Sequence, residues 1–184
     1  MQYLLLLRGI NVSGKRLIKM ESLVNLFNSL GFFNVKTYIQ SGNIVFESDI
    51  VDKQMVKLKI DTAIEIEFGF KIISFIFDSE EWEKAIRNNP FISNNLIDPD
   101  KLHLSFLNNI PLAELQNLII LDKNNEDEFK IINNIVYIYC PNGYGNTKFT
   151  NTFFEKKLRI NSTTRNLKTV LKLRDLLKLN KSLY

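Results

Sequence analysis

Polar and basic residues that could bind an anion follow the first apolar run of the chain. Arg8 ends that run, and Asn11 and Lys15 come next in a loop that also contains Gly9 and Gly14. Backbone N–H groups of a glycine-containing loop can surround a phosphate oxygen, and a lysine or arginine adds positive charge. We therefore predict that Arg8, Asn11 and Lys15 are ligand-binding residues.

A second polar stretch, Gln40-Ser41-Gly42-Asn43, supplies two amides and a hydroxyl. An amide can hydrogen-bond a base edge, a sugar or a carboxamide, which makes Gln40, Ser41 and Asn43 candidate ligand-binding residues. The same residues also suit a tight turn, because Ser and Asn bond their own backbone and Gly42 can take a positive φ. Both interpretations stay open at this point.

The elements around these two stretches predict that they lie close together. Leu4–Leu7 is a continuous apolar run, typical of a strand covered on both faces. From Met20 the apolar residues recur at helical spacing, and Gly31 ends that helix. Residues 35–39 and 44–46 are β-branched and aromatic, which predicts a hairpin around the second polar stretch.

A right-handed crossover makes the first two predicted strands parallel, and the third strand runs antiparallel to the second. The loop after the first strand and the hairpin turn then lie at the same end of the sheet. The N-terminus of the helix points the same way, and its partial positive charge favours an anionic ligand.

The stretch from Gly9 to Lys15 also matches the G-x-x-x-x-G-K pattern of nucleotide-binding loops, between a strand and a helix as required. Residues 75–78 resemble the second, metal-holding segment of such proteins. However, Arg16 stands where Ser or Thr would hold magnesium, the helix begins only near Met20, and the hairpin interrupts the parallel strand series. A looser anion-binding loop, or simply a well-made turn, fits these residues better.

The first half of the chain predicts a known order of elements. A helix over 51–68 and a strand over 70–77 complete β-α-β-β-α-β across residues 2–77, which is the ferredoxin-like order. We expect an α+β protein with a ferredoxin-like N-terminal half, 1–78, and a smaller α+β C-terminal half, 79–184, ending in two basic amphipathic helices. The second half echoes the first in its strand-helix-hairpin order, without a residue-level repeat. Its predicted elements are a short helix from Asp78, a strand over 102–107, a helix over 111–121, a hairpin of 128–132 and 135–139, a helix through 149–158 and a helix over 166–179.

The second half contributes further candidate ligand-binding residues. Residues 141–148 form a second glycine loop, in which Thr147 either binds phosphate with Lys148 or caps the next helix. Thr163-Thr164-Arg165-Asn166 is predicted to be a strand-free turn before the last helix, with one threonine as its cap. Arg165 could bind an anion with two hydrogen bonds, and Asn166 lies beside it. We expect Lys148, Arg165 and Asn166 to meet the first group in a basic cleft between the halves.

Several of these segments together resemble one protein family. The resemblance extends from residue 3 to about 177 and is to the DUF1697 family (domain of unknown function 1697). It implies the fold and the positions of the motifs, and no activity is established for the family. The segments that carry it are RGINVSGK, TYIQSGN, Asn89-Pro90-Phe91, Leu102-His103-Leu104, Pro141-Asn142-Gly143-Tyr144-Gly145 and Thr163-Thr164-Arg165-Asn166.

The chain departs from the pattern of that family at two positions. Asn146 stands where the family usually has arginine, and Leu167 where it usually has tryptophan. If the arginine binds an anion in the relatives, this chain is expected to bind it less well.

His103 and Cys140 are the single histidine and the single cysteine, so an internal disulfide and a soft-metal site are not expected. His103 stands in a predicted strand and points opposite to its leucine neighbours. A structural role is the more common one for such a histidine, and a catalytic role stays open. A Cys-His nucleophilic pair lacks supporting spacing. No metal and no cofactor are predicted.

Composition and charge place the chain among ordinary globular proteins. Apolar residues make up 45% and charged residues 24% of the 184 residues. No apolar run reaches the ~20 residues that a membrane span needs, and the N-terminus lacks the pattern of a signal peptide, so a cytoplasmic protein without membrane contact is expected. The net charge of +4 hides an asymmetry, because residues 146–184 hold ten Lys or Arg and two Asp or Glu.

Three functions follow as hypotheses. The first is binding of a small anionic or phosphorylated ligand, such as a nucleotide, with any catalysis resting on positioning and charge. The second is nucleic-acid binding by the basic C-terminal helices, and the third is protein interaction or self-association through the sheet edges. Whether the protein is an enzyme, which ligand it takes and its oligomeric state stay open.

Overall fold

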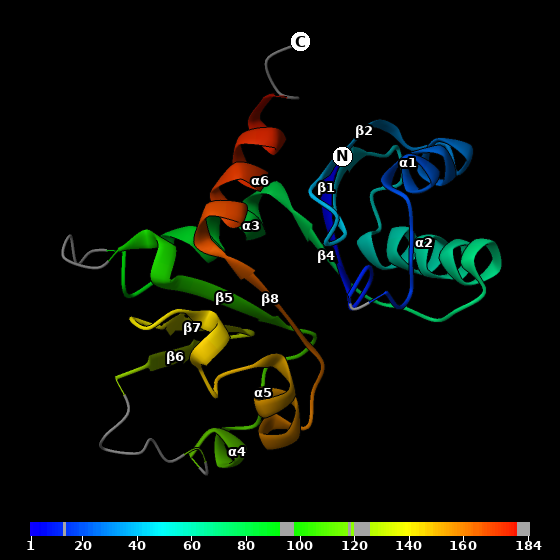
Figure 1. The fold of residues 1–184 in the computed structure, drawn as a ribbon. Coiled ribbons are helices and arrows are strands. Elements are labelled where there is room, and N and C mark those ends of the chain that lie inside the picture. The colour runs from blue at the N-terminus through cyan, green and yellow to red at the C-terminus, as the bar shows by residue number, and fades with distance from the viewer. Residues whose placement is uncertain (13, 93–97, 118, 120–125, 180–184) are drawn as a thin grey trace. The chain divides into compact units, whose positions relative to one another are not determined.

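The computed structural model describes residues 1–12, 14–92, 98–117, 119 and 126–179 (Figure 1). The chain divides into two compact units, each of which is described by itself. The first unit comprises Met1–Glu83 and Lys172–Tyr184, and the second comprises Lys84–Leu171. No helix in the described ranges combines the length and the apolar character needed to cross a bilayer.

The first unit has the predicted ferredoxin-like order. Its four strands form one sheet in the order β2-β3-β1-β4, and every neighbouring pair is antiparallel. β3 lies between β1 and β2, so the two strands joined by the first crossover are not neighbours. The elements are β1 (Gln2–Arg8), α1 (Met20–Ser29), β2 (Phe33–Tyr38), β3 (Asn43–Glu47), α2 (Lys53–Phe68) and β4 (Ile73–Asp78), followed by α3 (Ser79–Arg87).

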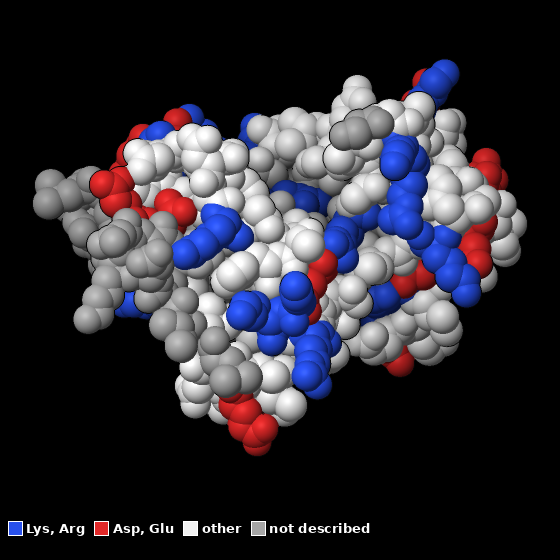
Figure 2. Space-filling model, turned by 60° about the horizontal axis from the view of Figure 1, so that its bottom comes forward, with Lys and Arg blue, Asp and Glu red and all other residues white. Residues whose placement is uncertain are grey.

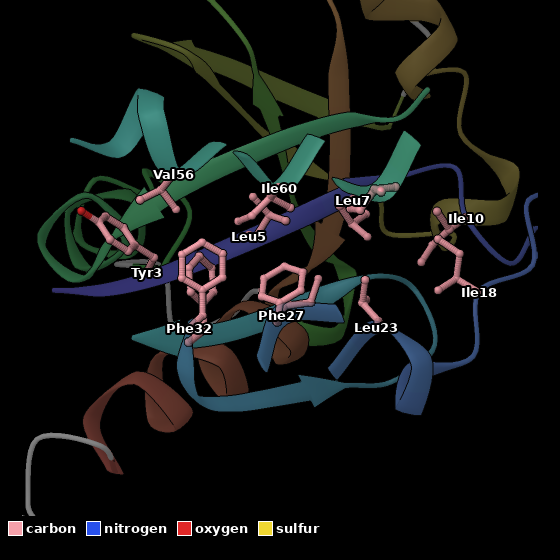
Figure 3. Packing of buried hydrophobic residues seen from close by; sticks show 13 residues of the cluster. Tyr3, Leu5, Leu7, Ile10, Ile18, Leu23, Phe27, Phe32, Val56 and Ile60 are labelled. Atoms are coloured by element: carbon pink, nitrogen blue, oxygen red, sulfur yellow. The ribbon is translucent and has the colours of Figure 1, made fainter. Parts of the chain in front are cut away.

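The core of the first unit lies between its sheet and the two helices α1 and α2. Tyr3, Leu5 and Leu7 point from one face of β1 toward Phe27 of α1 and Ile60 of α2 (Figure 3). The remaining leucines of the run face the other side of the sheet and are buried as well. The apolar character of the whole run is therefore explained by burial on both faces, and that burial is the main force holding the unit together.

The second unit has the same topology as the first. Its sheet has the order β6-β7-β5-β8, again antiparallel throughout, with α4 and α5 packed against one face. The two sheets therefore share one strand order, 2-3-1-4, counted within each unit. The elements are η1 (Pro99–Lys101), β5 (Leu102–Leu107), α4 (Ala113–Asn117), β6 (Glu128–Ile132), β7 (Ile135–Tyr139), η2 (Tyr144–Asn146), α5 (Asn151–Leu158) and β8 (Ser162–Asn166), and α6 (Leu167–Leu179) follows.

Equivalent hydrogen bonds confirm that the two sheets correspond strand by strand. The N–H of Leu7 donates to the carbonyl of Gly42 over 2.7 Å, and in the second unit Leu107 donates to Asn134 over 2.8 Å. At the opposite end, Ser48 donates to Met1 and Cys140 donates to Lys101, each over 2.9 Å. The chain is therefore a structural duplication. The sequence indicated only the shared strand-helix-hairpin order, without a residue-level repeat.

The prediction for residues 163–166 was wrong. They belong to the strand β8, where Thr164 pairs with Ser105 and Asn166 pairs with His103 of β5. Threonine is β-branched and suits a strand. The polar side chains are accommodated because they are hydrogen-bonded, for example Thr164 to Asn151 of α5 and Asn166 to the carbonyl of Asp100. The predicted threonine cap was also wrong, since Asn166 Oδ1 accepts a hydrogen bond from the N–H of Lys168 over 2.8 Å.

Two helix boundaries in the second unit differ from the prediction. α5 begins at Asn151, and Thr150 is its cap, because its hydroxyl accepts from the N–H of Phe153. Thr147 therefore does not cap this helix. The helix expected over 111–121 is α4, Ala113–Asn117, and residues 118, 120 and 121 lie outside the described residues.

Candidate functional site

The loop after β1 and the turn between β2 and β3 meet at one end of the first sheet. We call the residues 8–12, 14–19 and 38–43 the first rim. Asn11 joins its two parts, because its Nδ2 donates to the carbonyl of Gln40 over 2.9 Å and to that of Ile18 over 3.0 Å. Its Oδ1 accepts from the N–H of Ile18 over 2.8 Å. Asn11 is thus a brace that closes the loop and fixes it to the turn.

The turn itself is held by Asn43 and Gly42. Asn43 Nδ2 donates to the carbonyl of Tyr38 and to the hydroxyl of Ser41, each over 2.9 Å, and the side chain is buried. Gly42 has a φ of 75° and packs against β1. These contacts fit the turn chemistry expected for the stretch. Gln40, by contrast, has an exposed side chain, so its amide is accessible from solvent.

Positive charge is concentrated at the first rim. Residues 1–20 contain no Asp or Glu, whereas Arg8, Lys15, Arg16 and Lys19 all lie in this stretch. The last three are exposed and make no ion pair with any described residue. The guanidinium of Arg16 lies 5.9 Å from the centre of the Phe70 ring. α1 begins beside them without a side-chain cap on its first N–H groups, whose partial positive charge adds to that of the side chains, and Glu21 in the first turn offsets part of it.

The nucleotide-binding-loop alternative does not fit the observed sheet. Both neighbours of β1 are antiparallel to it, whereas such loops connect a strand to a helix within a parallel series. The helix starts at Met20, five residues after Lys15. The first rim is therefore a different kind of loop, whose anion binding would depend on its cations.

The predicted residues of the second unit do not share one face. Arg165 pairs with Leu104 in the β8–β5 register, and the neighbouring Asn166 pairs with His103, so their side chains lie on opposite faces. Arg165 is buried, and its Nη1 donates to the Thr163 hydroxyl and the Thr164 carbonyl, each over 2.9 Å. Burial lowers the pKa of its guanidinium to about 10, which leaves it charged at neutral pH.

Lys148 and Asn166 have different surroundings. Lys148 is exposed, with its ammonium 5.9 Å from the centre of the Phe149 ring. Asn166 Nδ2 donates to the carbonyl of Asp100 over 3.1 Å and lies 3.4 Å from His103 Nε2. Lys148, Arg165 and Asn166 belong to the second unit and the first rim to the other, so their expected meeting in one cleft stays a prediction.

A polar network that the sequence did not reveal lies on the α5 side of the second sheet. Asn151 Oδ1 accepts hydrogen bonds from Thr164 over 2.7 Å, from Ser162 over 3.0 Å and from Ser105 over 3.4 Å. Tyr144 stacks on His103 beside it, with ring centres 4.4 Å apart. Alternate polar residues at 162, 164 and 166 were the available signal for this network. The stack of Tyr144 on His103 joins the second glycine loop to the sheet.

Cys140 lies in the same unit and is inert as a nucleophile at neutral pH. Its side chain is buried, and burial raises the pKa of the thiol to about 11. The thiolate, which is the reactive form, is therefore scarce. Thr147, beside it, donates a hydrogen bond to Asp127 over 2.6 Å and accepts one from the N–H of Phe149. A Cys-His nucleophilic pair is accordingly not supported.

Comparison with known proteins identifies the chain at the level of family. A family model described as "Protein of unknown function (DUF1697)" matches residues 1–137. The chain belongs to the DUF1697 family. A solved structure of a conserved bacterial protein from Streptococcus pneumoniae is similar, with 25% sequence identity and a TM-score of 0.69 over 96% of this chain and 98% of that one. No curated protein matches this DUF1697 chain.

Basic side chains also lie outside the first rim of this DUF1697 protein. On the face drawn in Figure 2, Lys and Arg form several separate groups, with uncharged surface and some Asp and Glu between them. Phe149 and Phe154 of the basic α5 region are buried in the core, where they cannot stack on bases. Nucleic-acid binding by the C-terminal helices stays a prediction.

Among the described residues no group of three His, Cys, Asp or Glu could hold a metal ion.

We expect His103 to make this DUF1697 protein less stable in mild acid. Burial lowers the pKa of its imidazole below 6.5, while the nearby Lys101 carbonyl acts in the opposite direction. The unfolded chain then binds the proton more readily, so stability is lost as the pH falls through about 6.5. Urea midpoints at about pH 7.5 and about pH 5.5 measure the loss of stability. The midpoint of His103→Gln should fall less between these two pH values than that of the wild type. An equal loss in both proteins would contradict a role for His103.

Proposed function

We propose that this DUF1697 protein binds a small anionic or phosphorylated ligand, such as a nucleotide, at the first rim. The observation that carries the proposal is the loop after β1, which brings Lys15, Arg16 and Lys19 to the surface while the loop itself contains no Asp or Glu. The first acidic residue of the chain is Glu21, in the first turn of α1. Like charges held close together repel one another, so such a loop is electrostatically unfavourable without a counter-ion. An anionic ligand relieves that repulsion.

The second unit provides an internal comparison for these cations. The loop after β5 corresponds to the loop after β1, and its residues 108–112 are Asn-Asn-Ile-Pro-Leu. The same strand order forms there without any Lys or Arg in the loop, so the topology does not require them. This difference between two otherwise equivalent loops supports a ligand-binding role for the cations of the first rim.

The brace made by Asn11 supports the proposal from a second direction. Because Asn11 fixes the loop to the turn at residues 38–43, the cations are held on a preorganised backbone. A preorganised site loses less conformational entropy when it binds. The exposed amide of Gln40 lies on the same braced segment and could donate a hydrogen bond to a phosphate or to the rest of the ligand.

A thermal-shift screen with nucleotides and sugar phosphates tests this proposal. At a hundredfold excess of ligand over Kd, we expect the melting temperature to rise by about 5 °C. Arg8→Ala, and separately the double variant Lys15→Ala/Arg16→Ala, should lose most of this rise. The matched control is Lys156→Ala/Lys157→Ala, which removes the same charge from the other unit and should keep the rise. The proposal fails if no phosphorylated compound shifts the wild type, or if the control loses the shift equally.

A further inference from the structure

Three aliphatic side chains of the first rim are exposed next to the cations. Val12 is 58% exposed, Leu17 is 69% exposed and Ile39 is 52% exposed. Each is a sequence neighbour of Asn11 or of a residue to which the Asn11 side chain bonds, namely Ile18 and Gln40. The brace therefore holds the backbone segments that carry these three exposed apolar residues near one another, and apolar groups close together at a surface indicate a binding site more than scattered ones do.

Ile39 is unfavourable in its own right. Its φ is 50°, in the left-handed region, where a β-branched side chain is a genuine outlier. The other described non-glycine residues with positive φ are asparagines and arginines. In the second unit, the turn between β6 and β7 places Asn133 in this conformation, with a φ of 54°. The fold can thus be built with asparagine in such a turn, and strain of this kind is concentrated at functional sites.

Resting on the proposed function, we propose that the ligand of the first rim is a phosphate monoester whose ester group is aromatic or aliphatic. The cations of the loop bind the phosphate, and Val12, Leu17 and Ile39 cover the apolar group. Binding removes exposed apolar surface from water on both partners, which adds affinity that inorganic phosphate cannot gain. It also explains why the chain keeps a strained, exposed isoleucine where asparagine would fold more easily.

Calorimetric titration of the full chain with phenyl phosphate and, separately, with inorganic phosphate tests this proposal. We expect phenyl phosphate to bind about tenfold more tightly, since a partly covered ring buries enough apolar surface for that difference. In Val12→Ser/Leu17→Ser, the affinity for phenyl phosphate should fall to within about twofold of that for inorganic phosphate. The affinity for inorganic phosphate should be unchanged. The control is Ile110→Ser/Leu112→Ser, which changes two exposed aliphatic residues of the equivalent loop in the second unit and should not alter either affinity.

Ile39→Asn provides a variant that cannot fail merely by unfolding. Because asparagine tolerates the left-handed conformation, the free variant should melt at a higher temperature than the wild type while binding phenyl phosphate less tightly. Equal affinities of the wild type for the two anions would overturn this inference and leave the proposed function standing. Binding of neither anion would also overturn this inference, and the thermal-shift screen would then decide the proposed function separately. An unchanged preference for phenyl phosphate in Ile39→Asn and in Val12→Ser/Leu17→Ser would show that these side chains do not cover the ligand.

Discussion

Gly42→Ala is expected to lower the free energy of unfolding by about 3–5 kcal/mol, the largest effect of any substitution proposed for this chain. Gly42 has a φ of 75°, which costs any L side chain energy, and a Cβ there would lie 2.7 Å from Cβ of Leu7 and 2.9 Å from Cδ1 of Ile10. The first of these atoms is fixed to the central strand and cannot move aside. Relief would require breaking the Leu7–Gly42 hydrogen bond.

Gly31→Ala is the matched control for this prediction. Gly31 also has a positive φ, of 80°, but a Cβ there would meet nothing within 4 Å. Gly31→Ala should therefore lower the free energy of unfolding only by the cost of placing alanine at a positive φ, about 1–2 kcal/mol. Urea denaturation followed by circular dichroism measures both variants. Equal losses in the two would show that the close approach of the turn to β1 contributes nothing.

Asn11→Ala is expected to cost about 2–4 kcal/mol and to remove the thermal shift caused by phosphorylated ligands. The substitution leaves the N–H and the carbonyl of Ile18 and the carbonyl of Gln40 without the partner that Asn11 supplies. Ile18 is buried, so water replaces these bonds poorly. The residue also has a φ of 54°, which asparagine tolerates better than alanine.

Asn34→Ala separates the bracing role of Asn11 from the conformational preference of asparagine. Asn34 has nearly the same φ, 53°, but it is exposed, and its side chain makes no hydrogen bond in the described part of the chain. Asn34→Ala should lower the free energy of unfolding by about 1 kcal/mol and should leave ligand binding intact. Urea midpoints and the thermal-shift screen distinguish the two. A similar loss for both asparagines, or a retained ligand shift in Asn11→Ala, would contradict the bracing role.

The element types followed from local patterns in the sequence. The apolar run Leu4–Leu7, the helical spacing after Met20 and the turn residues around Gly42 predicted β1, α1 and the β2–β3 hairpin correctly, because burial of apolar faces dictates those patterns. The motifs quoted for the family resemblance were also sufficient to find the family. The proximity of the loop after β1 to the hairpin turn followed from strand directions alone, and the hydrogen bond between Asn11 and Gln40 confirms it.

Only the tertiary structure decided which polar residues act within the fold. β8 was not predicted, because Ser162 and Thr164 donate their hydrogen bonds to Asn151 of another element. A sequence pattern does not show such a partner. Arg165 and Asn166 are neighbours in sequence but lie on opposite faces of a strand. The duplication is hidden as well, because backbone hydrogen bonds define it and many side chains can form the same ladder. Local sequence therefore determined the elements, whereas long-range hydrogen bonds determined the surroundings of each polar side chain.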